Sequence, residues 1–283
     1  MDAFENKLTK MQDAAPDKID TAVKETNLFE ILRGFGRAAI GYSGGVDSTM
    51  LVAAAVKTLG AANAFAVLAD SPSLPRSELE SALALAKSLG VECVTFSPNE
   101  LADPDYAANP RNRCYFCKKR IFSTIAGIAA ERGIAVVLDG NNVDDEGDFR
   151  PGRQAAKELG IRSPLLEAGL TKAEIRAISA NWGLPTADKP AMACLASRIP
   201  YGTRITAEIL SQIDKAEVAL KAEGFAHCRV RHHGEVARIE VPSSEITRLA
   251  AEGARERIAA AIKASGYKFA ALDLLGYKMG GMN

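Results

Sequence analysis

The sequence has 283 residues, in which 35 Lys and Arg side chains balance 35 Asp and Glu side chains. A chain of this length can bury a full core, and it is more typical of two domains than of one. Because the formal net charge is zero, no overall field attracts nucleic acid or an anionic membrane, and we expect neither as a partner.

The N-terminus and the cysteines predict a cytoplasmic protein. The first ten residues, MDAFENKLTK, are charged and lack the apolar core and the small-residue cleavage site of a secretory signal. No apolar run approaches the roughly 18 residues that a membrane helix needs. Five cysteines, an odd number, fit a reducing compartment in which thiols carry chemistry or bind metal.

The first two thirds of the chain alternate between strand-like and helical segments. Residues 1–25 are polar and predict a loosely packed helix or arm. Apolar runs then predict buried strands at 37–42, 65–70, 92–96 and 135–139, and a fifth, shorter strand at 161–165. This alternation predicts an α/β fold, a parallel sheet with helices on both faces. Ligands of such sheets bind beyond the carboxyl ends of the strands, where Ser43, Asp70 and Asp139 fall.

The pattern changes near Pro200. From Ile205 onward it predicts a small α+β unit with its own core. The expected order is helix (207–224), strand (227–233), strand (236–241), helix (243–266) and strand (268–274). We therefore expect a first domain at residues 1–202 and a second at 203–283, the latter for substrate binding or oligomerisation.

The turn after the first predicted strand contains Ser43, Gly44, Gly45, Asp47 and Ser48. Glycines let a ligand approach the backbone, and the free amides and the dipole of the following helix favour an anion. The turn is not a Walker A loop, because the lysine and the four-residue gap between glycines are missing. The alternative is a glycine-rich turn that is capped by Asp47 or Ser48 and binds nothing. The strand-turn-helix context favours phosphate.

SGGVDS, residues 43–48, resembles the SGGxDS signature of the PP-loop ATP pyrophosphatase superfamily, which has an adenine nucleotide alpha hydrolase-like fold. The resemblance implies that this loop holds the β and γ phosphates of ATP, while a substrate oxygen attacks the α phosphate. It also implies that Asp47 is catalytic and positions a Mg²⁺ ion that bridges the phosphates. The segment 68–79 would receive the adenine of ATP through backbone groups, and Asp70 within it would be among the residues that bind ATP.

Three cysteines are candidates for chemistry. Cys114 and Cys117 form a CxxC motif with basic neighbours, and Cys194 lies near the expected domain boundary. Three thiols can hold a [4Fe-4S] cluster with one iron left open, or a zinc ion if a histidine joins them. A redox pair is a third interpretation of CxxC. Cys93 and Cys228 are interpreted as small, buried apolar residues.

Five blocks together resemble the LarE family, the ATP-dependent sulfur transferases of nickel-pincer cofactor biosynthesis. They are SGGVDST, ADSPSLPR, NRCYFCKKRIF, DGNNVDDEGDFRPGR and KPAMACLASRIPYG. The resemblance implies a homo-oligomer that acts on a pyridinium mononucleotide with carboxylates. One carboxylate would be adenylated with release of pyrophosphate, and sulfur would then displace AMP to give a thiocarboxylate.

The family resemblance leaves two sources of sulfur open. In one branch a cysteine gives up its sulfur and becomes dehydroalanine, and Cys194 is the matching residue. In another branch three cysteines hold an iron-sulfur cluster, which Cys114, Cys117 and Cys194 match. Because an enzyme that uses up one cysteine has no need of CxxC, we favour the cluster.

The predicted strand 227–233 places His227, Arg229, Arg231 and His233 on one face. A solvated polar face explains this alternation, and so does a phosphate site built from two arginines. An Arg-x-Arg in LarE-like proteins favours phosphate, and we expect Ser197 and Arg198 to join it. Three further residues, Asn141, Asp144 and Asp145, would line the site or cap a turn.

Two other interpretations remain. The chain could be another PP-loop enzyme, a tRNA thiolase or an amide-forming synthetase, although its balanced charge argues against an RNA surface and its length leaves no room for a glutaminase domain. It could also be a non-catalytic nucleotide sensor, which would leave the three cysteines unexplained. We therefore predict an ATP pyrophosphatase that transfers sulfur.

Overall fold

The computed structural model describes residues 16–145 and 151–277. Contacts divide the chain into two units, and the chain passes between them several times. The first unit comprises residues 1–70, 79–98 and 118–191, and the second comprises 71–78, 99–117 and 192–283. These two units differ from the expected domains at residues 1–202 and 203–283. That domain boundary stays a prediction.

The first unit is built on a four-stranded sheet in the order β3-β2-β1-β4. All of the neighbouring pairs are parallel, which confirms the predicted parallel sheet. The strands are β1 (Ala38–Tyr42), β2 (Ala64–Ala69), β3 (Glu92–Phe96) and β4 (Val137–Leu138). The fourth strand is therefore shorter than its apolar run suggested.

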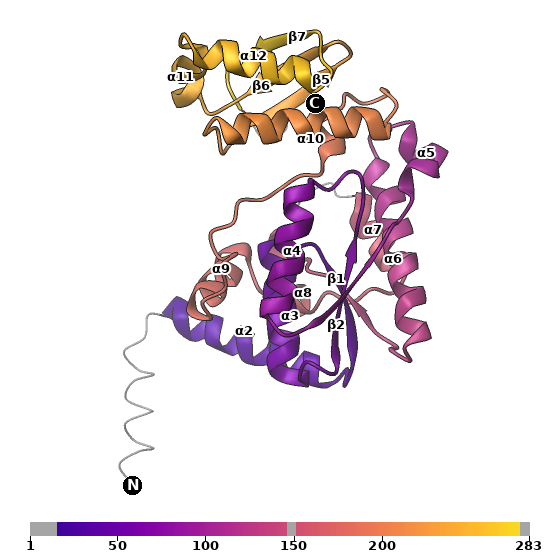
Figure 1. The fold of residues 1–283 in the computed structure, drawn as a ribbon. Coiled ribbons are helices and arrows are strands. Elements are labelled where there is room, and N and C mark those ends of the chain that lie inside the picture. The colour runs from indigo at the N-terminus through magenta and orange to yellow at the C-terminus, as the bar shows by residue number, and fades with distance from the viewer. Residues whose placement is uncertain (1–15, 146–150, 278–283) are drawn as a thin grey trace. The chain divides into compact units, whose positions relative to one another are not determined.

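Helices cover both faces of this sheet, as predicted. On one face, Phe122 and Ile125 of α6 pack against Phe65 and Val67 of β2, while α3 contacts β1 and β2. Figure 1 shows α3 and α6 on opposite sides of the strands. The helices in this part of the chain are α2 (Pro16–Arg33), α3 (Val46–Leu59), α4 (Arg76–Ser88), α6 (Arg113–Glu131), α7 (Pro151–Glu158), α8 (Pro164–Glu167) and α9 (Lys172–Asn181), with a 3₁₀ turn η2 (Val143–Asp145).

The prediction of a fifth strand at 161–165 is wrong. A single parallel bridge joins Leu138 to Arg162, and Pro164 then begins helix α8. Proline has no N–H to donate to a strand, and its fixed φ suits the first turn of a helix. The apolar side chain of Leu165 is buried, but within that helical turn.

The second unit contains a three-stranded sheet in the order β5-β6-β7. The pair β5–β6 is antiparallel and the pair β6–β7 is parallel. Its core includes Phe225, Val230, Ile239 and Ile262. The elements are η1 (Glu100–Ala102), α5 (Pro104–Ala107), η3 (Leu195–Arg198), α10 (Ala207–Ala222), β5 (Arg229–His233), β6 (Val236–Glu240), η4 (Ser243–Glu245), α11 (Ile246–Ala250), α12 (Ala254–Ala264) and β7 (Phe269–Leu272).

The predicted order of the C-terminal elements is confirmed, with one interruption. The helix expected at 243–266 is divided into η4, α11 and α12. Helix α11 is capped by Ala251, whose backbone is extended, and Gly253 then precedes α12 with φ of 82°, a value that suits glycine.

At the N-terminal end, α2 begins at Pro16. Only part of the arm expected at residues 1–25 is therefore within the described chain, since residues 1–15 lie outside it. Leu28 and Leu32 of this helix are fully buried, so its second half belongs to the core. In the ranges that the structure describes, no helix has the length and apolar character needed to cross a membrane.

Candidate functional site

The loop between β1 and α3 depends on its first glycine. Gly44 has φ of 69°, and a Cβ atom at this position would lie 2.6 Å from the Cβ of Ala82. Only glycine fits both the backbone and the space. Gly45 then caps α3 with an extended backbone and no side-chain hydrogen bond. The first amides of the helix are thus left to face an anion.

The two serines of the loop hold its shape. The amide of Ser43 donates to the hydroxyl of Ser48 at 3.2 Å, and the two hydroxyls lie 3.1 Å apart. The hydroxyl of Ser48 also reaches the carbonyl of Gly45 at 3.3 Å. Ser48 is buried, whereas Ser43 is exposed. Ser43 is therefore the hydroxyl that a ligand in the turn can reach.

Two lysines that the sequence did not single out lie at this loop. The Nζ atom of Lys172 is 2.5 Å from a carboxylate oxygen of Asp47, and Nζ of Lys189 donates to the carbonyl of Gly44 at 3.0 Å. An ammonium group binds phosphate as a point charge. Lys189 opens the block KPAMACLASRIPYG, which was a usable signal. No local sequence pattern identifies Lys172, because its partner Asp47 lies 125 residues earlier in the chain and only folding brings the two together.

The residues after β4 form a network of turns beside the loop. The side-chain amide of Asn142 donates to the carboxylate of Asp47 at 3.3 Å, and its backbone amide donates to the carboxylate of Asp145 at 3.0 Å. Asp144 accepts from the amide of Lys172 at 2.6 Å. Asp144 and Asp145 thus accept from backbone amides, while Asn142 and Lys172 both connect them to Asp47.

Asp139, at the end of β4, is a buried carboxyl group. Ser163 donates to it at 2.7 Å, and the backbone and side chain of Asn141 donate at 3.1 and 2.5 Å. Burial raises the pKa of Asp139 above its usual value, against the opposing effect of these donors. Asp70 lies directly after β2, half-buried, and its amide donates to the carbonyl of Phe96 at 2.8 Å.

The three candidate cysteines all lie in the second unit. Cys114 and Cys194 are exposed, Cys117 is half-buried, and none is in a disulfide. Among the described residues, which include all three, no group of three or more His, Cys, Asp or Glu side chains could hold a metal ion. The described residues therefore give no support to the expected [4Fe-4S] cluster.

Tyr106 connects the thiol-bearing segments. Its side chain packs with Leu195 and Cys117, and its hydroxyl lies 2.7 Å from that of Ser73. The carbonyl of Ser73 accepts from the amide of Leu195 at 2.8 Å. Burial, followed by the neighbouring Cys194 thiol, raises the pKa of Tyr106 far above its usual range. Tyr106 thus remains a neutral phenol.

Of the remaining thiols, Cys228 is buried in the core of the second unit, which confirms its interpretation as a packing residue. Burial raises its pKa to about 12. Cys93 lies half-buried in β3, and burial raises its pKa to about 11. Neither thiol is ionised to a useful degree near neutral pH.

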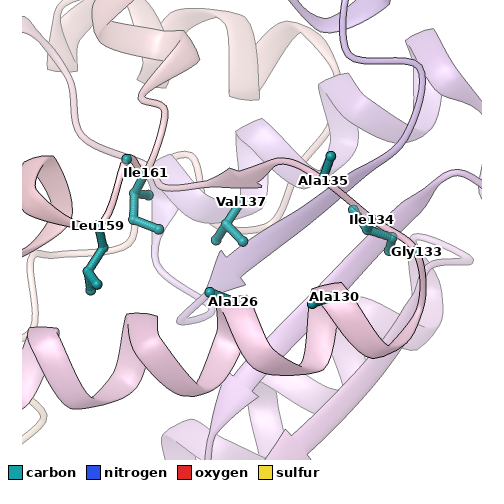
Figure 2. A pocket seen from close by; sticks show the side chains of 9 residues that line it. Ala126, Ala130, Gly133, Ile134, Ala135, Val137, Leu159 and Ile161 are labelled. Carbon is teal, nitrogen blue, oxygen red and sulfur yellow. The ribbon is translucent and has the colours of Figure 1, made fainter.

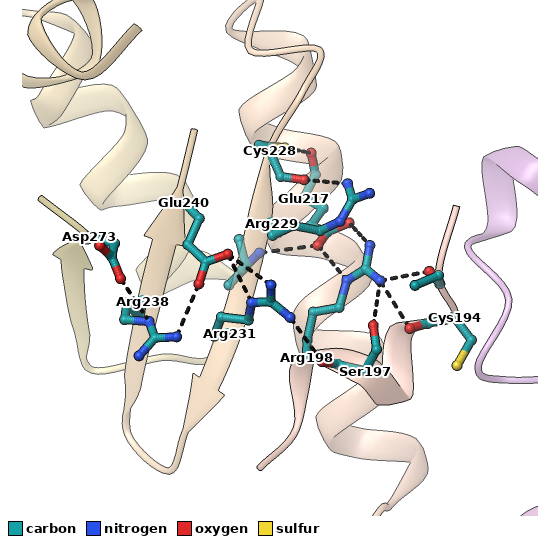
Figure 3. Close-up of polar contacts among 12 residues, drawn as sticks. Cys194, Ser197, Arg198, Glu217, Cys228, Arg229, Arg231, Arg238, Glu240 and Asp273 are labelled. Atoms are coloured by element: carbon teal, nitrogen blue, oxygen red, sulfur yellow. Dashed lines mark hydrogen bonds and ion pairs between the residues drawn. The ribbon is translucent and has the colours of Figure 1, made fainter. Parts of the chain in front are cut away.

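The predicted alternation along β5 is incomplete, because Arg231 is buried like both of its neighbours. Figure 3 shows Arg229 and Arg231 on this strand. Val230 and His232 are buried, while Arg229 and His233 are more exposed. Arg231 is buried beside Glu240, with Nε 3.0 Å from a carboxylate oxygen, and it also donates to the carbonyl of Ser197 at 3.0 Å. His227 lies before the strand begins.

Arg229 differs from its neighbour. Its guanidinium donates to the carbonyl of Cys228 at 2.7 Å and lies over the ring of Tyr277, 5.2 Å from the centroid. Among the described residues it has no carboxylate partner. On the adjacent strand, Arg238 pairs with Glu240 at 3.0 Å and with Asp273 at 3.5 Å. Arg229 is therefore the arginine of this face whose charge is not already neutralised by a carboxylate.

Arg198 is fully buried, and its guanidinium lies within the protein. It forms a forked pair with Glu217 at 2.9 and 3.2 Å. It also donates to the carbonyls of Ala193 and Cys194 at 2.6 and 3.0 Å, and to the hydroxyl of Ser197 at 2.9 Å. Figure 3 shows these contacts beside the sulfur of Cys194.

A cavity of about 450 Å³ lies elsewhere in the first unit (Figure 2). Its lining contains only alanine, glycine, isoleucine, valine and leucine, from α6, β4 and the segment after α7. It offers no charged or polar side chain to a phosphate or a carboxylate. The cavity is therefore not part of the candidate site.

Comparison with known proteins supports the chemistry suggested by the loop. A family model described as NAD synthase matches residues 25–106. An uncharacterised protein of Synechocystis sp. is 44% identical over 260 residues, which is 92% of this chain and 97% of the relative. The pyridinium-3,5-bisthiocarboxylic acid mononucleotide synthase of Lactiplantibacillus plantarum is 36% identical over 262 residues, 93% of this chain and 94% of the relative. A glutamine-dependent NAD(+) synthetase of Synechocystis sp. matches over 62 residues only, 22% of this chain and 11% of the relative.

Proposed function

The chain belongs to the LarE family of PP-loop sulfur transferases, and we propose that it converts carboxylates of a pyridinium mononucleotide into thiocarboxylates with ATP as the activating substrate. The observation that carries the proposal is the match along nearly the whole chain to a relative named for a bisthiocarboxylic acid mononucleotide. The loop geometry supports it, because the backbone of Gly44 and the uncapped first turn of α3 are features that favour an anion.

In the first half-reaction, a carboxylate oxygen of the substrate attacks the α phosphate of ATP. A bond forms between that oxygen and phosphorus, and pyrophosphate leaves with the electrons of the broken P–O bond. The amides of Gly45 and the start of α3 would hold the leaving phosphates, with the Nζ atoms of Lys172 and Lys189 as further cations. Asp70 is proposed to contact ATP from the end of β2.

Asp47 is the residue proposed to hold Mg²⁺. Magnesium in nucleotide sites is bound by one or two carboxylates, with phosphates and waters as the other ligands, so a single half-exposed carboxylate fits. When bound, the ion offsets the charge of the phosphates. Lys172, which now pairs with Asp47, would then bind phosphate oxygens in place of the carboxylate.

In the second half-reaction, the thiolate of Cys194 attacks the carbonyl carbon of the acyl adenylate. A C–S bond forms, the C–O bond breaks, and AMP leaves. Loss of the Cα proton of residue 194 then breaks its Cβ–Sγ bond, which releases the thiocarboxylate and leaves dehydroalanine. The exposed thiol at the start of η3 supports this route, and no group of three ligands among the described residues supports the cluster alternative.

The substrate phosphate is proposed to bind on the polar face of β5. Arg229 supplies a charge without a carboxylate partner among the described residues, Arg231 a second guanidinium, and Ser197 a hydroxyl. Arg198 lies behind them, buried. We also propose that the protein is cytoplasmic and homo-oligomeric, as the family resemblance implies.

The proposal is tested by incubating the anaerobically purified protein with ATP, Mg²⁺ and the pyridinium dicarboxylate mononucleotide. We expect pyrophosphate, a thiocarboxylate, and loss of one H₂S mass from the protein. Cys194→Ser should still release pyrophosphate but form no thiocarboxylate. If no pyrophosphate appears from the unaltered chain, the proposed function is wrong.

Cys114→Ser is the control that separates the two sulfur sources. If Cys194 alone gives up its sulfur, this variant should form as much thiocarboxylate as the unaltered chain. If three thiols hold a cluster, the variant should lose iron and activity together, and the protein should then show no mass loss after turnover.

A further inference from the structure

The segment that carries Cys194 is held by its backbone while its thiol is exposed. Arg198 donates to the carbonyls of Ala193 and Cys194, and Arg231 donates to the carbonyl of Ser197. From the other side, the carbonyl of Ser73 accepts from the amide of Leu195. Four points of the main chain, at residues 193, 194, 195 and 197, are therefore fixed by buried groups.

The nitrogens of Arg198 are all engaged. Nε and one terminal nitrogen bond to Glu217, and the other terminal nitrogen bonds to three oxygens within residues 193–197. A guanidinium has five N–H donors and no acceptor. Every nitrogen of this buried guanidinium therefore already donates to an oxygen of the protein.

Glu217 connects Arg198 to β5, the strand that carries the arginines proposed to bind phosphate. It lies on α10 with 2% exposure, and the oxygen that accepts from Nε of Arg198 also accepts from the amide of Val230 at 3.1 Å. Val230 lies between Arg229 and Arg231 on β5. One carboxylate therefore connects the backbone of the sulfur-bearing segment to the row of arginines.

We propose that Arg198 is a positioning residue, which with Glu217 fixes Cys194 at a set separation from Arg229 and Arg231 and does not itself bind substrate. The inference rests on the proposed function, because the separation matters only if the thiol and the arginines act on one mononucleotide. A substrate whose phosphate is held by the arginines then presents its activated carboxylate to a thiol that is already in place.

The experiment compares Arg198→Lys and Glu217→Gln with Arg257→Gln, which removes an exposed arginine paired with Glu223 in the same unit. Three quantities are measured: pyrophosphate release, thiocarboxylate formation, and hydrogen exchange of the amides at 193–199. In the first two variants we expect pyrophosphate release and the KM for the mononucleotide to stay within about threefold, while thiocarboxylate formed per pyrophosphate falls about 100-fold. Amide exchange in 193–199 should accelerate in these two variants and stay unchanged in Arg257→Gln.

Two results would overturn the inference. If Arg198→Lys raises the KM for the mononucleotide and lowers both products equally, Arg198 binds substrate. If sulfur transfer and amide exchange are both unchanged, Arg198 positions nothing. Should Arg198→Lys fail to fold, the double variant Arg198→Met with Glu217→Leu removes both charges together, a change that buried pairs tolerate, and normal sulfur transfer in it would equally overturn the proposal.

The positioning role can be separated from the proposed function. Hydrogen exchange needs no substrate, so it reports on the segment even if the unaltered chain releases no pyrophosphate. Faster exchange at 193–199 without any pyrophosphate would leave the positioning role standing and remove the assigned reaction.

Discussion

Replacing Gly44 with alanine should destabilise the first unit and disable its loop. A non-glycine residue in the left-handed region costs about 1 kcal/mol or slightly more. The new Cβ atom would also lie 2.6 Å from the Cβ of Ala82 and 3.1 Å from its Cα. These are atoms close to the backbone, which cannot rotate away, and overpacking of this kind costs about 1–3 kcal/mol. We therefore expect a loss of about 2–4 kcal/mol in the free energy of unfolding.

Gly36→Ala is the matched control. Gly36 has nearly the same φ, 67°, but no atom lies within 4 Å of the place that an added Cβ would occupy, so only the backbone cost of about 1 kcal/mol should appear. Urea unfolding of both variants measures the difference, and pyrophosphate release should fall in Gly44→Ala alone. If the two variants lose the same stability, the contact with Ala82 does not constrain the loop and the steric argument is refuted.

Three further predictions concern a lysine that contacts the loop, two thiols and a buried ion pair. Lys172→Met should raise the KM for ATP at least about tenfold, because it removes a phosphate-binding charge, whereas Lys87→Met, at an exposed lysine of the same unit, should not. In alkylation at pH 8 followed by mass spectrometry, exposed Cys194 should react long before Cys228, whose pKa of about 12 leaves about one thiol in 10,000 ionised. Labelling of Cys228 should rise only as the pH approaches 12, and rapid labelling at pH 8 would contradict its burial. Arg198→Met should cost about 3–5 kcal/mol in urea unfolding, because it leaves the buried carboxylate of Glu217 without its positive partner. If Arg198→Met lowers the free energy of unfolding no more than Arg257→Met, which breaks an exposed ion pair, the importance of the buried pair is contradicted.

The parts of the fold that the sequence predicts are those set by local patterns. The apolar runs of the sheet are short and separated by amphipathic helices, so the parallel α/β order follows directly. The loop is also local, because Gly44 and Gly45 lie between a strand and a helix within a few residues. Where two local signals compete, as at 161–165, the apolar run suggested a strand, but the helical preference of Pro164 prevailed.

The contacts that the sequence does not predict depend on distant partners. Lys172 reaches Asp47 from 125 positions away, and no pattern around Lys172 signals that contact. Arg198 is predicted as a phosphate ligand because it stands near Cys194 in the sequence. Its partner Glu217 lies on α10, 19 residues further on, and nothing in the helix reveals that this carboxylate is buried. The role of Arg198 as a phosphate ligand is a prediction that the assays above test.

The second unit takes in the loops that follow β2 and β3, together with residues from 192 onward. Tyr106, from one of those loops, shares a core with Leu195, Leu210 and Ile213. A polypeptide that contained only residues 203–283 would therefore expose the apolar side of α10 to water and tend to aggregate. Exchanging C-terminal regions between relatives would succeed only if residues 71–78 and 99–117 were transplanted with them, so these distant stretches are expected to change in concert as sequences diverge.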